Sequence, residues 1–170
     1  MRVVALLACV SALVVVGCGH SMASMVGPAP YAAEDAPRKP PVTRRGRNNP
    51  LLKEYGRLPA KEVLLGKASF YHDSLAGNLT ANGEYYKLGK ITAAHLTLPF
   101  CSVVRVIRRD TGHTVLVRIN DRGPYGNRGR ILDLSRAAAE AIGMIGIGVA
   151  PIRAEVVKVG DGCTYHHLRR

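Results

Sequence analysis

The chain reads Arg118-Ile119-Asn120-Asp121-Arg122-Gly123-Pro124-Tyr125 where an alternating run, Thr114 to Ile119, comes to its end. Alternation of apolar residues predicts a β-strand. Gly-Pro predicts the turn that follows, because Gly accepts unusual backbone angles and Pro fixes its own φ. Asp121 is therefore predicted at a strand end, where a carboxylate suits acid–base chemistry. Asn-Asp-x-Gly is equally ordinary turn composition, in which the carboxylate only accepts backbone N–H groups or pairs with Arg122.

Short strands are predicted on both sides of this stretch. They are Leu64–Tyr71, Val103–Arg108, Arg130–Leu134 and Ile152–Val159. Asp110-Thr111-Gly112 predicts a hairpin turn into Thr114, and Ser135 is predicted to cap a helix from Arg136 to Ile142. Several short strands, one small helix and many glycine turns predict a compact, mainly β barrel.

Residues 1–17 have the composition of a secretion signal. Arg2 supplies a positive charge, and Val3 to Val16 contains no charge, Pro or Gly. As a helix this run rises only ~21 Å, short of the ~30 Å hydrocarbon core of a bilayer, so a spanning helix is not expected. The run ends Val15-Val16-Gly17-Cys18, which resembles a bacterial lipobox. We expect Cys18 to be lipidated; the alternative is an ordinary signal peptide cut elsewhere.

The composition changes again near residue 60. Residues 18–60 hold most of the prolines and several basic clusters without apolar periodicity, which predicts a lipidated cysteine followed by a disordered linker. Leu51, Leu52 and Tyr55 indicate that the end of the linker packs on the domain. Residues 61–160 are predicted to form that domain, and residues 161–170 a C-terminal tail.

The formal net charge of +12 predicts anionic surroundings. Nucleic acid is the default partner of a basic cytosolic chain, but an exported lipoprotein does not meet it, so no nucleic-acid partner is expected. Anionic lipid head groups and cell-wall polymers carrying peptide carboxylates are better candidates. The charge predicts attraction and not chemistry.

Cys101 and Cys163 would remain after Cys9 leaves with the signal and Cys18 is lipidated. An oxidising compartment predicts a disulfide between them, which would tie the tail to the domain and contribute ~2–4 kcal/mol. The alternative is a Cys–His catalytic pair, for which nothing adjacent to Cys101 argues. The histidines lack the spacing of a zinc site, so neither a metal nor a cofactor is expected.

Four spaced segments carry a resemblance. They are Gly66–Tyr71 (GKASFY), Leu79–Glu84 (LTANGE), Leu88–Pro99 with Thr92-Ala93-Ala94-His95, and Asn120–Pro124 (NDRGP) continuing to Gly129–Ser135. Together they resemble the rare lipoprotein A (RlpA) family of septal-ring lytic transglycosylases over residues 63–159. The resemblance implies a mainly β fold, a six-stranded double-psi β-barrel with one or two short helices.

The resemblance also implies an enzyme, an endolytic peptidoglycan lytic transglycosylase that cleaves MurNAc-GlcNAc strands to 1,6-anhydro-MurNAc ends during cell-wall remodelling. Its catalytic positions fall on Asp121 as acid and base, with Glu84 and His95 contributing. One acid–base group can suffice, because the C6 hydroxyl of the substrate itself attacks. From the residues alone, Glu84 is equally a turn residue after Asn82-Gly83, and His95 is more typical of a satisfied, partly buried histidine.

Four further side chains are candidates for substrate binding: Arg122, Tyr71, Arg128 and Arg130. The arginines are suited to binding glycan or to binding stem-peptide carboxylates. The alternative is that they are solvated charges on the rim of the barrel. The Tyr71 ring could stack on a sugar face or simply pack within the domain.

The resemblance implies a monomer that acts on peptidoglycan glycan strands and is lipid-anchored in the cell envelope, at the outer membrane facing the periplasm. The alternatives are a non-catalytic, expansin-like peptidoglycan-binding barrel and a structural envelope lipoprotein. Residues 161–170 leave no room for the SPOR module that many relatives carry, so septal targeting by that route is not expected.

Overall fold

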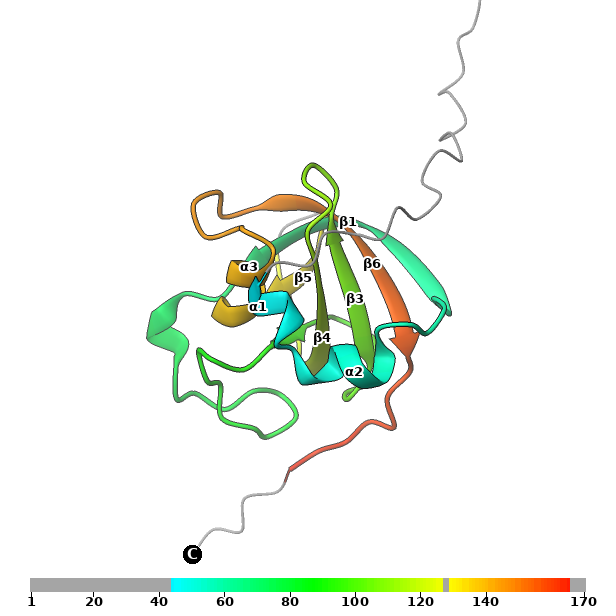
Figure 1. The fold of residues 1–170 in the computed structure, drawn as a ribbon. Coiled ribbons are helices and arrows are strands. Elements are labelled where there is room, and N and C mark those ends of the chain that lie inside the picture. Colours follow the sequence, from blue (N-terminus) through cyan, green and yellow to red (C-terminus); the bar gives the residue numbers. More distant parts are fainter. Residues whose placement is uncertain (1–43, 127–128, 166–170) are drawn as a thin grey trace, which may run out of the picture. The chain divides into compact units, whose positions relative to one another are not determined.

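The computed structural model describes residues 44–126 and 129–165 (Figure 1). The signal segment, the lipidation site Cys18 and the candidate Arg128 lie outside the described residues. Within the described part of the chain, no helix has the length and apolar character needed to cross a bilayer.

Six strands close into a barrel in the order β1-β5-β2-β4-β3-β6 (Figure 1). They are β1 (Glu62–Phe70), β2 (Thr92–Ala94), β3 (Val103–Arg108), β4 (Thr114–Asp121), β5 (Arg130–Leu134) and β6 (Ala150–Lys158). β1 runs parallel to β5 and β2 parallel to β4, whereas the other neighbours are antiparallel. The predicted six-stranded barrel is confirmed, and closure leaves no open edge in the sheet.

Most predicted elements occur close to their predicted bounds. β3 and β5 match, and β4 continues two residues beyond the predicted end, to Asp121. Helix α3 (Arg136–Ala141) starts where predicted, with the Ser135 hydroxyl accepting the N–H of Ala138 at 3.3 Å. β2 was not predicted as a strand, because three residues are too few to show alternation.

Aliphatic side chains fill the inside of the barrel. Those that are fully buried include Val104, Val106, Val117, Ile119, Leu132, Leu134, Ile152 and Val156. α3 and the turn after it add Ala138, Ala139, Ala141, Ile142 and Met144 to the same cluster. Close packing of this kind makes the strand ends a rigid support for the residues that follow them.

Residues 44–60 differ from the expected disordered linker. They contain helices α1 (Arg44–Arg47) and α2 (Pro50–Tyr55). Leu51, Leu52 and Tyr55 pack against a second apolar cluster, formed by Val103, Leu116 and Val157. β4 is therefore buried on both faces, with the barrel core on one side and α2 over the other. Burial of this outer cluster offsets the conformational entropy lost when the segment is ordered.

Asn49 begins α2 and also joins it to the barrel. Its side-chain oxygen accepts the N–H of Leu51 at 3.0 Å, and its Nδ2 donates to the carbonyl oxygen of Leu116. Pro50 occupies the first helical turn. A capping Asn followed by Pro is a helix-start signal, and here it outweighs the linker-like composition around it.

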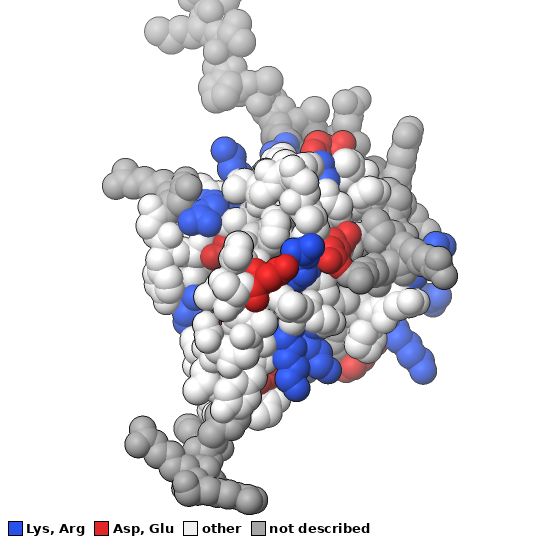
Figure 2. Space-filling model, turned by 90° about the vertical axis from the view of Figure 1, so that its left-hand side faces the viewer, with Lys and Arg blue, Asp and Glu red and all other residues white. Residues whose placement is uncertain are grey.

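Ion pairs compensate several of the surface arginines. Arg136 of α3 binds Asp73, in the short 3-10 helix η1 (Asp73–Leu75), at 2.8 Å and Glu140 at 3.0 Å. α3 lies on the left in Figure 1, the side that faces the viewer in Figure 2. Figure 2 shows acidic and basic side chains next to one another there, rather than in separate fields.

We expect Asn49→Ala to lower the free energy of unfolding by about 1–3 kcal/mol, because it removes a helix cap and leaves a buried carbonyl without its donor. Urea unfolding monitored by circular dichroism measures the change. Asn48→Ala is the matched control, since Asn48 is exposed and precedes the cap. Equal stability of the two variants would contradict the role given to Asn49.

Candidate active site

Strand pairing places four residues in one row across the barrel. Ala94, at the end of β2, pairs with Asp121 of β4 on one side and with Asp133 of β5 on the other. Asp133 pairs in turn with Ser69 of β1. The carboxylates Asp121 and Asp133 thus lie on either side of β2 at one end of the barrel.

Asp121 is the last residue of β4, at the strand end predicted for it. Its Oδ1 accepts the backbone N–H groups of Ala81 and Arg122, each at 2.8 Å. Its Oδ2 accepts the hydroxyl of Tyr71, also at 2.8 Å. Among the residues the structure describes, Oδ2 has a single donor and retains a lone pair for a ligand, whereas Oδ1 accepts two backbone N–H groups.

Gly123 and Pro124 follow the end of β4, but no turn forms at these two residues, in contrast to the prediction. Gly123 has a φ of 144°, a conformation that L side chains rarely adopt, and the peptide bond to Pro124 is cis. Both residues are buried.

Tyr71 lies immediately after β1 and contacts Asp121 through its hydroxyl. Burial, followed by the charge of Asp121 and the hydrogen bond to it, raises the pKa of Tyr71 well above its ordinary value. The phenol therefore stays protonated and donates. Its ring packs edge-on against Tyr86, with the ring centroids 5.0 Å apart. Tyr71 thus combines the packing expected of it with a direct contact to the carboxylate.

Glu84 forms the most heavily bonded ion pair of the site. Its carboxylate accepts hydrogen bonds from the two terminal nitrogens of Arg118 at 2.7 and 2.8 Å. It also accepts hydrogen bonds from the side-chain amides of Asn82 and Asn120 at 3.2 Å each. Burial raises the pKa of Glu84, but the hydrogen bonds and charge of Arg118, together with the two amides, outweigh burial and hold that pKa below its usual value. The negative charge of Glu84 is therefore compensated locally.

His95 follows β2 and is nearly buried. Its backbone N–H donates to the carbonyl oxygen of Asp121 at 3.2 Å, which fixes it next to that residue. Nδ1 accepts the N–H groups of Thr97 at 3.2 Å and Leu98 at 3.0 Å, so the proton of the neutral ring is on Nε2. Burial, followed by the charge of Arg122, lowers the pKa of His95. Near neutral pH, His95 therefore presents an uncharged N–H donor.

Arg122 is engaged by the loop that follows β2. Its guanidinium lies 3.7 Å from the centroid of the Phe100 ring. It also donates to the carbonyl oxygens of His95 at 3.2 Å and Leu98 at 2.9 Å. These contacts hold the loop that carries His95 against the end of β4.

Arg130 is the first residue of β5, the strand that also carries Asp133. It donates to Ser69 Oγ at 2.8 Å and lies 3.6 Å from a carboxylate oxygen of Asp133. Ser69 Oγ in turn donates to that carboxylate. Sequence reasoning did not assign Ser69 or Asp133 to the site, since only strand register brings Asp133 next to β2 and Ser69 next to Asp133.

Arg118 is a further residue of the site that sequence reasoning did not single out. A signal was present in β4, because Arg118 and Asn120 are polar residues two apart in a strand most of whose other residues are buried. Residues two apart lie on one face of a strand. Both donate to Glu84 from that face.

A disulfide joins Cys101 to Cys163, with the two Cα atoms 5.8 Å apart. One guanidinium nitrogen of Arg118 lies 3.9 Å from Cys101 Sγ. Asp161 contributes a carboxylate close to both sulfurs. Sulfurs joined in a disulfide are not thiolate ligands, so these three residues do not form a metal site in this state.

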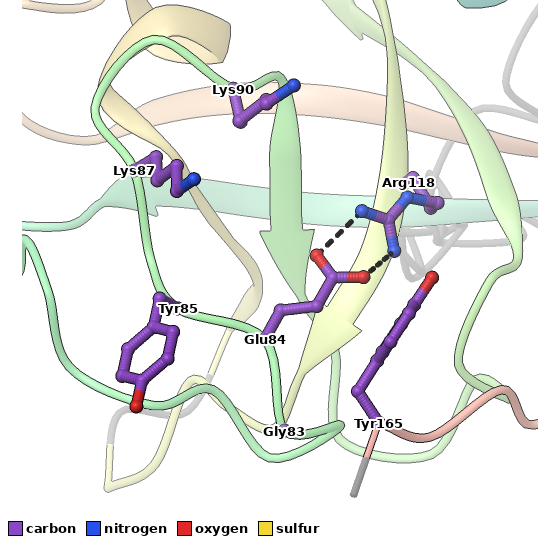
Figure 3. Close-up of a pocket in the computed structure, with 7 residues that line it drawn as sticks. All are labelled: Gly83, Glu84, Tyr85, Lys87, Lys90, Arg118 and Tyr165. Atoms are coloured by element: carbon purple, nitrogen blue, oxygen red, sulfur yellow. Dashed lines mark hydrogen bonds and ion pairs between the residues drawn. The ribbon is translucent and has the colours of Figure 1, made fainter. Parts of the chain in front are cut away.

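A pocket of about 350 Å³ lies beside the Glu84–Arg118 pair. Its lining residues are Gly83, Glu84, Tyr85, Lys87, Lys90, Arg118 and Tyr165. In Figure 3 the Glu84–Arg118 ion pair lies between the two lysines on one side and the Tyr165 ring on the other. The ring stands next to the guanidinium of Arg118. The loop before β2, β4 and the C-terminal segment thus all contribute to one concave surface.

Several known proteins are similar to this chain. The endolytic peptidoglycan transglycosylase RlpA of Vibrio cholerae is 51% identical over 94 residues, which are 55% of this chain and 35% of that protein. The probable endolytic peptidoglycan transglycosylase RlpA of Nostoc is 54% identical over 94 residues, 54% of this chain and 25% of the relative. The chain therefore spans between 25% and 35% of the length of these relatives.

Among solved structures, the Streptomyces papain inhibitor is 25% identical, with a TM-score of 0.48 over 59% of this chain and 99% of that one. An expansin of Clavibacter michiganensis is 22% identical, with a TM-score of 0.45 over 59% of this chain and 52% of that one. Residues 64–154 match a family model described as lytic transglycolase. The chain thus belongs to the lytic transglycolase family, and its six-stranded barrel is a double-psi β-barrel.

Proposed function

We propose that this protein is an endolytic lytic transglycosylase that cleaves the MurNAc-GlcNAc strands of peptidoglycan to 1,6-anhydro-MurNAc ends. The observation that carries the proposal is the carboxylate of Asp121, held by backbone on Oδ1 and open to a ligand on Oδ2. Its barrel is about half identical to those of relatives named endolytic peptidoglycan transglycosylases, which supports the same chemistry.

The reaction needs one group that first gives and then takes a proton. Asp121, protonated on Oδ2, gives its proton to the glycosidic oxygen as the bond between that oxygen and C1 of MurNAc breaks. The C6 hydroxyl of the same sugar forms a bond to C1, and its proton returns to Oδ2. Atoms balance without added water, and the carboxyl group is restored at the end of each turnover.

We assign supporting roles in this step to Tyr71 and His95. The Tyr71 hydroxyl donates to Oδ2 and stabilises the negative charge that appears when the proton leaves. The Nε2–H group of His95 can donate to a sugar oxygen, because Nδ1 is occupied by two backbone donors.

Glu84 acts in this proposal as a positioning residue and not as a second acid. Its pairing with Arg118 holds the loop that ends at Glu84 against β4. Ala81 in that loop supplies one of the two N–H groups bound to Asp121 Oδ1, so the ion pair helps to orient the carboxylate.

We also propose that the protein acts as a monomer, anchored by a lipid on Cys18 in the outer membrane and facing the periplasm. The lipobox-like sequence before Cys18 supports the anchor. Labelling of cells with a fatty-acid analogue, followed by membrane fractionation of wild type and Cys18→Ser, tests it. Label on both proteins would contradict lipidation at Cys18.

We expect Asp121→Asn to lower the rate of formation of anhydro-ended products from purified sacculi by about 10²–10⁴-fold, the range for loss of a general acid–base group. Mass spectrometry of the soluble products measures it. Asp110→Asn, in the turn at the opposite end of β4, is the matched control. Binding to sacculi with no new ends from wild type would instead favour the expansin-like binding barrel.

Glu84→Gln should lower stability at pH 7 and make less difference in acid. The pKa of Glu84 is lower in the folded state, so the contribution of its charge is complete above the ordinary value of 4.5 and is lost as the pH falls through the lowered value. Urea unfolding of wild type and variant at pH 7 and at about pH 3 measures the difference, with Glu54→Gln on the exposed side of α2 as control. A difference that is independent of pH would refute the ion-pair account.

The imidazole of His95 should titrate below its ordinary pKa of 6.5, with the proton of the neutral ring on Nε2. Long-range ¹H–¹⁵N NMR spectra of the purified protein, recorded from pH 5 to pH 8, report both properties, within the window in which an unperturbed histidine titrates. Assignment comes from the spectrum of His95→Gln. A neutral ring protonated on Nδ1 would rule out the donor role given to Nε2.

A further inference from the structure

The segment after β6 returns across the end of the barrel that carries the site. Its backbone hydrogen bonds are Gly160 N to Ser102 Oγ at 2.9 Å, Gly162 N to Phe100 O at 3.1 Å and Tyr165 N to Asn82 O at 2.7 Å. The Cys101–Cys163 disulfide lies between the second and the third of these bonds. Residues 159–165, here named the return segment, are therefore fixed at several points and end next to the loop that contains Glu84.

Gly83 is adapted to this close approach. It has a φ of 89°, and a Cβ added there would collide with the carbonyl group of Tyr165. Any other residue at this position would push the return segment away. The loop that carries Glu84 and the return segment are thus fitted to each other at the backbone.

Within the described residues, backbone hydrogen bonds and the disulfide hold the return segment, and the side chain of Tyr165 makes no hydrogen bond. Its ring is about half exposed, with a relative accessibility of 52%, and lines the pocket together with Glu84 and Arg118. Figure 3 shows the ring standing alongside the Arg118 guanidinium. An aromatic face that is exposed to a ligand but anchored through its own backbone offers apolar contact area at little cost in conformational entropy.

The charge of the pocket comes from two lysines. Glu84 and Arg118 neutralise each other through two short hydrogen bonds. The ammonium groups of Lys87 and Lys90 have no hydrogen-bond or ion-pair partner among the residues the structure describes, and both line the same pocket. Within the described surroundings, the pocket therefore favours a ligand that carries negative charge.

We propose that this pocket is a subsite for an acidic sugar residue, in which Tyr165 supplies the platform for the ring while Lys87 and Lys90 bind its carboxylate. The disulfide between Cys101 and Cys163 positions Tyr165, so the subsite depends on the oxidised form. The inference rests on the proposed function, because it takes a peptidoglycan glycan strand as the ligand of the pocket. N-acetylmuramic acid, which carries a lactyl carboxylate when its peptide has been removed, matches this chemistry.

Binding and turnover of one probe test the subsite. The probe is glycan strands from purified sacculi, freed of peptides with an amidase. We expect Tyr165→Ala to raise both Kd, measured by calorimetry, and KM about tenfold with kcat nearly unchanged, which corresponds to about 1.4 kcal/mol. Tyr165→Phe should retain most of the affinity, since it keeps the ring. Val159→Ala is the matched control, because Val159 is similarly exposed in the same segment but does not line the pocket.

Reduction tests the role of the disulfide. Mild reductant should weaken binding by wild type to the level of Tyr165→Ala, and the Cys163→Ser variant should bind at that same level. Neither change should weaken binding by Tyr165→Ala any further. Wild-type affinity and KM in Tyr165→Ala would overturn the subsite, as would equal loss in Val159→Ala. Equal binding by reduced and oxidised wild type would overturn the positioning role of the disulfide.

These outcomes separate the subsite from the proposed enzyme. If wild type binds the strands but makes no anhydro ends, the proposed reaction fails, and the Kd values of the Tyr165 variants still decide the subsite. If wild type cuts the strands and Tyr165→Ala cuts them with the same KM, the reaction stands and the subsite fails. Absence of binding by oxidised wild type would overturn the subsite directly.

Discussion

The docking of the loop before β2 onto the end of β4 is the constraint on which the site depends. Asn82 N donates to the Asn120 carbonyl oxygen, and Ala81 N donates to the carboxylate of Asp121. One loop backbone thereby orients Asp121 and positions Glu84. Because β4 is packed on both faces, this strand end cannot move without disturbing the core. The candidate catalytic carboxylate thus lies at the end of a buried strand, and a loop backbone orients it.

The charged groups of this site differ in the partners that compensate their charge. Glu84 is neutralised by Arg118, and the guanidinium of Arg122 lies on an aromatic ring and two carbonyl oxygens. Asp121 is instead hydrogen-bonded by two backbone N–H groups and one phenol. Ionised groups held by such contacts are suited to holding structure, whereas a carboxylate that accepts hydrogen bonds from neutral donors is available for proton transfer.

The barrel was largely predictable from the sequence, because four of its strands show β-branched residues bounded by turn residues and α3 has a recognisable cap. β2 and α2 were not. β2 is too short to show a period, and the capping Asn49 and Pro50 of α2 lie in a linker-like composition, where contact with Leu116 adds stability that the sequence does not show. The strand-end position of Asp121 followed from the alternation of β4. The sequence did not show that Glu84 pairs with Arg118, nor that Ala94 lies in a row between Asp121 and Asp133. Contacts between segments that are not neighbours in the chain, strand register among them, leave no mark in a single sequence.

The cover that α2 places on the barrel sets a limit on how the domain can be shortened. A fragment that begins at residue 60 would retain all six strands and the whole family match. It would also uncover Val103, Leu116 and Val157, which together form an apolar area on the outer wall. Such areas drive self-association once they meet water. The smallest well-behaved unit of this protein therefore begins ahead of Asn49, inside what its composition presents as a tether.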